Sequence, residues 1–289
     1  MHATADSEPV LACVYSLPRS GSTALTAQLD RWKGIVCLPE SYFPQMLELL
    51  TPEEFSNSKR MAELFIASSD SGSAITLDEA ERCMVPNNAT ETLKRLGLTC
   101  AKKTQRDPAQ VKAVVWKTTR IVGRWKVFAR AGGRFIVLRR NPLNVFESQF
   151  RVDFGRNNRN ALRFAAFAES YEAAFSRLPK HLTACIDYES IPEQLPTILS
   201  FLGLSQQELW TSGQSLLAPT AATRDWHGRI LDDFQSRDSQ QSKNLSATQR
   251  FSLRFGRIMF LPARPLTGML RDYYDRGVMD YLRTKKIEN

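Results

Sequence analysis

The chain has 289 residues, 43% of them hydrophobic, and a formal net charge of +9. This size allows one large domain with a substantial core, and no linker-like stretch divides it, so we expect a single domain over residues 1–289. The N-terminal residues 1–9 are polar and acidic and no run of eighteen apolar residues occurs, which argues against a signal peptide or membrane anchor.

Short apolar runs alternate with helical patterns along the first two thirds of the chain. The expected strands are residues 11–17, 34–38, 114–116, 135–138 and 182–186. Helices are expected from residue 24, over 120–131, from the N-cap Asn141 to about 154, over 159–178 and over 192–202. This alternation predicts an α/β fold, a parallel sheet with helices on both faces, whose ligands bind beyond the carboxyl ends of the strands.

Two regions are less regular. Residues 41–110 mix helical pieces with polar stretches, and the pattern weakens again after residue 205. Residues 250–274 are basic and apolar, as in a membrane-surface helix, but Pro262 and Pro265 interrupt them. We therefore expect residues 205–289 to form a packed C-terminal helical region.

The cysteines are odd in number and widely spaced: Cys13, Cys37, Cys83, Cys100 and Cys185. They form no CxxC pair and no cluster with histidine that would hold zinc. We expect reduced thiols in a cytoplasmic protein and no metal site.

One segment carries the whole positive excess. Between Lys112 and Arg163 there are 13 Lys and Arg and two acids, a net of +11, so the rest of the chain sums to −2. Such a segment is either a solvated surface or an anion site. A nucleic-acid groove is not favoured, because no zinc finger, RNP signature or basic zipper occurs.

The loop after the first strand has the position of a phosphate-binding loop. In the GxxxxGK[ST] register set by Gly21, Ser16 replaces the first glycine and Ser22 the lysine, which disfavours ATP or GTP hydrolysis. Gly21 permits close backbone approach, the amides and hydroxyls of Ser22 and Thr23 lie at a helix N-terminus, and Arg19 supplies positive charge.

Residues 18–23, Pro-Arg-Ser-Gly-Ser-Thr, resemble the 5′-phosphosulfate-binding loop of sulfotransferases that use 3′-phosphoadenylyl sulfate (PAPS). The resemblance implies that the donor is held by Arg19, Ser20, Gly21, Ser22 and Thr23. It also implies the family's fold, an α/β sheet related to nucleotide kinases. The motif layout is most similar to tyrosylprotein, carbohydrate and bacterial sulfotransferases.

Two further stretches resemble the same family. In residues 134–149, RFIVLRRNPLNVFESQ, Arg140 follows a strand and Ser148 lies eight positions later, as in the family's 3′-phosphate motif. Arg140 has the bidentate geometry for phosphate, although either residue seen singly would be an ordinary surface side chain. Residues 186–204 resemble a Tyr-Glu-x-Leu and Phe-Leu-Gly-Leu stretch with a structural role. The resemblance covers a core of about residues 10–204.

Sulfuryl transfer needs charge neutralisation and a base for the acceptor proton. Arg19 is placed to stabilise charge near the bridging oxygen, and Lys117 is either a second such cation or a solvated strand-end lysine. Glu40 occupies the place of the catalytic glutamate of tyrosylprotein and carbohydrate sulfotransferases; otherwise it is an exposed loop carboxylate. Cations in these roles make a metal unnecessary.

The histidine used by cytosolic small-molecule sulfotransferases has no match. His2 is terminal, and His181 and His227 lie in no matching motif. Residues 224–229, Arg-Asp-Trp-His-Gly-Arg, faintly resemble the loop that closes over the nucleotide, so residues 205–289 are expected to cover the nucleotide and acceptor sites.

The resemblance therefore implies transfer of a sulfuryl group from PAPS to a small-molecule or glycan hydroxyl or amine, with release of PAP and no membrane or nucleic-acid partner. A nucleotide- or nucleic-acid-binding protein without catalysis is the alternative from another class. A P-loop kinase is a third, weakened by the absent Walker lysine. The acceptor and the oligomeric state are not encoded in a recognisable pattern.

Overall fold

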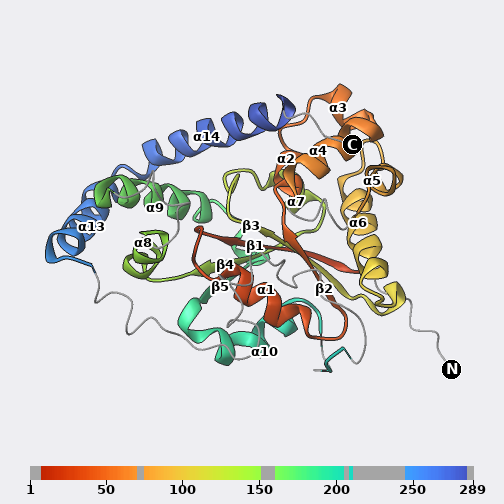
Figure 1. The fold of residues 1–289 in the computed structure, drawn as a ribbon, viewed down its shortest axis with the longest axis horizontal. Coiled ribbons are helices and arrows are strands. Elements are labelled where there is room, and N and C mark those ends of the chain that lie inside the picture. Colours follow the sequence, from red (N-terminus) through yellow and green to blue (C-terminus); the bar gives the residue numbers. More distant parts are fainter. Residues whose placement is uncertain (1–7, 70–74, 151–159, 205–207, 211–244, 285–289) are drawn as a thin grey trace.

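The computed structural model describes residues 8–69, 75–150, 160–204, 208–210 and 245–284. Its centre is a five-stranded parallel sheet in the order β2-β3-β1-β4-β5 (Figure 1). The strands are β1 (Val10–Ser16), β2 (Ile35–Glu40), β3 (Ala113–Thr118), β4 (Arg134–Arg139) and β5 (Thr183–Asp187). All five predicted strands are present, and the predicted fold class is confirmed.

Alternate residues of β1 enter two separate cores, because side chains of a strand point to opposite faces. Ala12 and Val14 pack with α1 (Ser22–Asp30) and α10 (Ile191–Phe201), whereas Cys13 and Tyr15 pack against the opposite group of helices. That group includes α6 (Ala89–Lys103), α7 (Lys126–Arg130), α8 (Pro142–Phe150) and α9 (Ala161–Phe175). Helices therefore cover both faces, which explains why β1 and β3 are buried along almost their whole length.

The region of residues 41–110 is more helical than its sequence pattern indicates. It contains α2 (Phe43–Met46), α3 (Pro52–Ser56), α4 (Ser58–Ser68), α5 (Leu77–Cys83) and α6. Side-chain caps start four of these helices, from Thr51, Asn57, Thr76 and Asn88. Short 3-10 helices occur at Pro108–Gln110, Lys180–Leu182 and Tyr188–Ser190.

Residues 245–284, the described part of the C-terminal region, contain two long helices, α13 (Ala247–Phe260) and α14 (Arg264–Thr284), and both pack on α9. Glu169 of α9, only 1% exposed, pairs with Arg257 at 3.0 Å and with Arg264 at 2.8 Å. These pairs join the inner faces of α13 and α14 to α9. The outer face exposes Phe251 by 69% and Ile258 by 70%.

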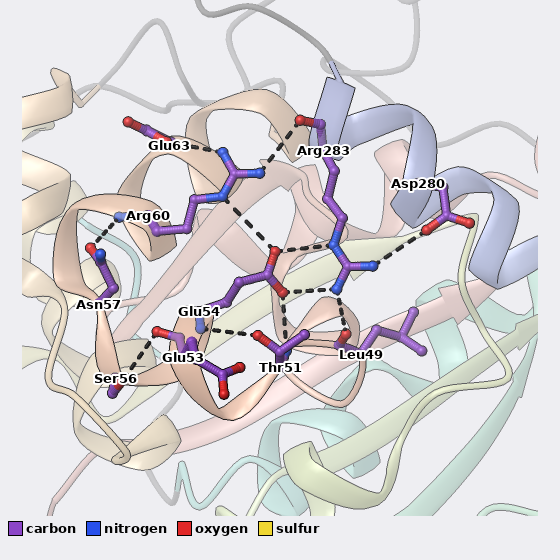
Figure 2. Close-up of polar contacts among 10 residues, drawn as sticks. All are labelled: Leu49, Thr51, Glu53, Glu54, Ser56, Asn57, Arg60, Glu63, Asp280 and Arg283. Carbon is purple, nitrogen blue, oxygen red and sulfur yellow. Dashed lines mark hydrogen bonds and ion pairs between the residues drawn. The ribbon is translucent and has the colours of Figure 1, made fainter.

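An ion-pair network fixes the far end of α14 to α3 and α4 (Figure 2). Arg283 binds both carboxylate oxygens of Glu54, at 3.0 and 2.8 Å, and donates to the Leu49 carbonyl at 2.9 Å. Arg60 in turn donates to the Arg283 carbonyl at 3.4 Å. The last turn of α14 is therefore capped and charge-paired by a segment more than 200 positions earlier.

The prediction of a helix over residues 120–131 is wrong. Only Lys126–Arg130 is helical, and a turn precedes it. The Gly123 amide donates to Asp275 Oδ2 of α14 at 2.9 Å, and a Cβ at Gly123 would lie 2.6 Å from that oxygen. The apolar residues of this turn, Ile121 and Val122, are buried by tertiary contacts rather than by a helix face.

Among the described helices, including the 21-residue α14, none combines the length and apolar character needed to cross a membrane.

Candidate functional site

The loop between β1 and α1 lies at the centre of the sheet, between the ends of β3 and β4 (Figure 1). Gly21 is the N-cap of α1 with φ of 91°, and a Cβ there would lie 2.2 Å from the Tyr188 ring. Glycine is therefore required both by the backbone and by this close approach. The helix beginning at Ser22 directs its N-terminus into the crevice where ligands of parallel α/β sheets bind.

Side chains from β4 and α8 hold this loop. Arg19 has φ of 74°, and its Nε donates to Ser148 Oγ at 3.3 Å. Arg140 Nη1 donates to the Arg19 carbonyl at 3.0 Å, and Gln149 Nε2 donates to the Pro18 carbonyl at 3.2 Å. The structure therefore brings together Arg19, Arg140 and Ser148, which the sequence analysis took from two motifs more than 100 positions apart.

The two arginines form a compact cationic pair. Burial lowers the pKa of the Arg19 guanidinium below its usual value, and the charge of Arg140 lowers it further. Arg140 also lies over the Tyr188 ring, with 4.3 Å between its Cζ and the ring centroid. An anion placed between these groups relieves their repulsion, so the pair is suited to bind one.

On the other side of the loop, β3 contributes Lys117 and β2 contributes Glu40. Lys117 is 6% exposed, and its Nζ donates to Thr23 Oγ1 at 3.2 Å and lies 3.7 Å from Glu40 Oε2. The alternative of a solvated strand-end lysine is therefore wrong. Glu40, with its side chain 18% exposed, is likewise not an exposed loop carboxylate.

Glu40 has two hydroxyl donors that the sequence analysis missed. Thr119 Oγ1 donates to Glu40 Oε1, and the Tyr42 hydroxyl donates to the same oxygen at 3.3 Å. No local pattern marks Thr119, because it meets Glu40 only when β2 and β3 pair. Tyr42, two positions after Glu40, lies in the less regular region of residues 41–110, where the sequence analysis named no site residue.

Ser20 and Ser22, which were also predicted to hold the donor, are both buried. Ser20 is almost fully buried, and its backbone N–H closes the turn by donating to Leu17 O at 3.0 Å. Ser22 is buried in the first turn of α1. Beside the loop, Ser20, Arg140 and Arg257 of α13 help line a small hollow. The C-terminal region thus reaches the edge of the site.

Of the three histidines, the structure describes only His181. His181 precedes β5 and so lies at the opposite edge of the parallel sheet. His2, His227 and the loop of residues 224–229 lie outside the described residues. In the part of the chain that the structure describes, no group of three or more His, Cys, Asp or Glu side chains could hold a metal ion.

The fold and these side chains define an α/β protein in which a cationic loop and a carboxylate lie at the same edge of the sheet. No protein-family model and no curated protein matches the chain. Its structure is similar to the sulfotransferase domain from the curacin biosynthetic pathway, with 18% identity, 86% of this chain and 97% of that chain covered, and a TM-score of 0.45. It is also similar to the sulfotransferase domain from the Synechococcus PCC 7002 olefin synthase, with 18% identity, 90% of this chain and 98% of that chain covered, and a TM-score of 0.44. Such low values carry no argument about activity.

Proposed function

We propose that this protein is a PAPS-dependent sulfotransferase that transfers a sulfuryl group to an acceptor hydroxyl or amine and releases PAP. The observation that supports this most is the division of the site. On one side of the loop, Arg140 and Ser148 both contact Arg19, through its carbonyl and its guanidinium respectively. On the other side, Lys117 Nζ lies 3.7 Å from Glu40 Oε2. A donor with phosphate at one end and a reacting sulfate at the other needs such a division.

Each side chain has a role that fits its surroundings. Arg140 and Ser148 would bind the 3′-phosphate, while Arg19, the Ser22 and Thr23 amides and Lys117 would bind the 5′-phosphosulfate. Lys117 already reaches Thr23 at 3.2 Å, so it lies within the same anion cradle. These cations would neutralise charge on the departing phosphate oxygen.

Glu40 would be the general base. It would take the proton of the acceptor group while the acceptor oxygen or nitrogen forms a bond to sulfur. The bond between sulfur and the bridging oxygen then breaks, and its electron pair stays on the phosphate of PAP. Atoms and charge balance without any other reactant, so we propose that the reaction needs no metal. We also propose a small-molecule or glycan acceptor and a cytoplasmic location.

The function is tested by thermal-shift measurements with PAP, PAPS and ATP·Mg²⁺, followed by labelled-sulfate transfer from PAPS onto cell extracts. We expect PAP to raise the melting temperature and transfer to continue in excess EDTA. Binding of PAP without transfer to a broad panel of acceptors would support a non-catalytic nucleotide-binding protein. Stabilisation by ATP·Mg²⁺ but not PAP would support a kinase, and EDTA-sensitive transfer restored by Mg²⁺ would contradict metal independence.

A further inference from the structure

The Glu40 carboxylate is held asymmetrically. Its Oε1 accepts from both the Thr119 and Tyr42 hydroxyls, whereas its Oε2 lies 3.7 Å from Lys117 Nζ. Because Lys117 also donates to Thr23, the Oε2 side is the one toward the phosphate loop. The two oxygens of this carboxylate therefore have different surroundings, and only one of them faces the cation cradle.

The turn that carries Thr119 is fixed from several directions. The Thr119 backbone carbonyl accepts a hydrogen bond from the buried Tyr171 hydroxyl of α9 at 2.6 Å. The Thr118 hydroxyl donates to the Arg120 carbonyl at 2.7 Å within the turn. Ile121 has φ of 43° and is fully buried. A β-branched residue in this left-handed conformation is strained, and such strain persists only where the surrounding structure over-determines it.

The Tyr42 hydroxyl reaches the same oxygen of Glu40 from a second element, the start of α2. Tyr42 caps the start of α2, and its ring lies 5.5 Å from Arg120 Cζ, so the same turn after β3 also contacts this second donor. Two independent elements thus converge on one carboxylate oxygen. A purely structural link between β2 and β3 would not need two hydroxyl donors on one oxygen, because these strands are already paired at Glu40 and Lys117.

We propose that Thr119 is a positioning residue for the base, assisted by Tyr42. The two hydroxyls occupy Oε1 and thereby turn Oε2 toward the acceptor, so that Oε2 takes the acceptor proton. This inference rests on the proposed function. It goes beyond it by assigning the proton to one oxygen and by giving a catalytic reason for the strained turn.

The test is Thr119→Val, which keeps the shape of the side chain and removes the hydroxyl. We expect kcat for transfer from PAPS to fall by about ten- to a hundredfold, while the KM for acceptor and the Kd for PAP change by less than about threefold. Thr119→Ser should restore most of the rate. Tyr42→Phe, which removes one donor from a different element, should lower kcat by a smaller factor and serves if Thr119→Val folds poorly.

Thr92→Val is the matched control. The Thr92 hydroxyl is also buried and hydrogen-bonded, to the Val85 backbone at 2.9 Å, but it lies in α6 and touches no predicted site residue. It should lower the melting temperature and leave kcat unchanged. A kcat loss of equal size in Thr92→Val would show that Thr119→Val acts only through stability.

A double-mutant cycle with Glu40→Gln separates the possible failures. We expect Glu40→Gln to lower kcat by about a hundredfold or more, and Thr119→Val to add almost nothing in that background, because Thr119 acts through Glu40. Full kcat in Thr119→Val, or losses that multiply in the double variant, would overturn the positioning role and leave the base intact. Full kcat in Glu40→Gln would overturn both. Absence of any transfer by the wild-type protein would instead refute the proposed function itself.

Discussion

Arg140 makes three interactions, with two residues, that distinguish it from a surface charge at the end of a strand. It donates to the Arg19 carbonyl, lies over the Tyr188 ring and shifts the pKa of the Arg19 guanidinium downward, after burial has already lowered it. Tyr188 also packs so closely on Gly21 that a Cβ there would lie 2.2 Å from its ring. The stretch around Tyr188, expected to be only structural, therefore contacts both Arg140 and the loop of the proposed anion site.

At this scale we predict that Arg140→Ala weakens PAP much more than adenosine 5′-phosphosulfate, because only PAP carries the 3′-phosphate. A charge-assisted bidentate contact implies a loss on the order of 2 kcal/mol or more, measured by calorimetric titration. Arg139→Ala is the control, since Arg139 is exposed and pairs with Glu172 at 3.1 Å. Equal losses for the two nucleotides would show that Arg140 supports the loop but does not read the phosphate.

At the scale of elements, we predict that Arg283→Ala lowers the unfolding free energy by about 1–3 kcal/mol at pH 7, because a charged hydrogen-bond donor to Glu54 and Leu49 is lost. Burial alone raises the pKa of Glu54, but hydrogen bonds from Arg283 and the Thr51 backbone outweigh it and hold the pKa below its usual 4.5. A lowered carboxyl pKa stabilises the fold above the unfolded value and loses this effect as pH falls through the folded value.

The difference between Arg283→Ala and wild type should therefore be full at pH 7 and shrink below about pH 4, as followed by urea denaturation at several pH values. Arg276→Ala, an exposed arginine of the same helix, should have almost no effect at either pH. A difference that stays constant with pH would mean that the Glu54 pair contributes little to anchoring α14.

The strands and most helices were predictable because their apolar periodicity is local. The N-cap Asn141 behaves as expected, with its Oδ1 accepting from Leu143 N at 3.0 Å. The helix over residues 120–131 was not predictable as a turn, because the contact of Gly123 with Asp275 spans 152 positions. Arg19 and Arg140 were predicted from motifs, Glu40 from the family layout and Lys117 from its place at a strand end. The contact of Thr119 with Glu40 was not predictable, because it forms only when β2 pairs with β3.

At the scale of the whole molecule, the fold buries three thiols completely and leaves one exposed. Cys13 of β1, Cys37 of β2 and Cys100 of α6 are fully buried, whereas Cys185 on the edge strand β5 is exposed. Burial raises the pKa of each of the three buried thiols above its usual value, and the thiolate is the form that reacts. Their modification therefore requires that the fold opens, while that of Cys185 does not.

We predict that an aromatic disulfide reagent at pH 8 labels Cys185 within minutes in the native protein and labels the three buried thiols only on unfolding. Cys83, 5% exposed, should be labelled at an intermediate rate.

In mild denaturant, PAP should slow labelling of Cys13 and Cys37, whose strands end at the proposed site, because a ligand of the folded state reduces the open population by mass action. At a PAP concentration about 100 times its Kd, the slowing should approach a hundredfold. Cys185 is the internal control and should be unaffected by PAP. Peptide mass mapping of the labelled chain at successive times gives all five rates at once. Rapid native labelling of Cys13 would contradict the buried β1, and labelling of Cys13 that is indifferent to PAP would argue that the nucleotide does not bind the folded chain.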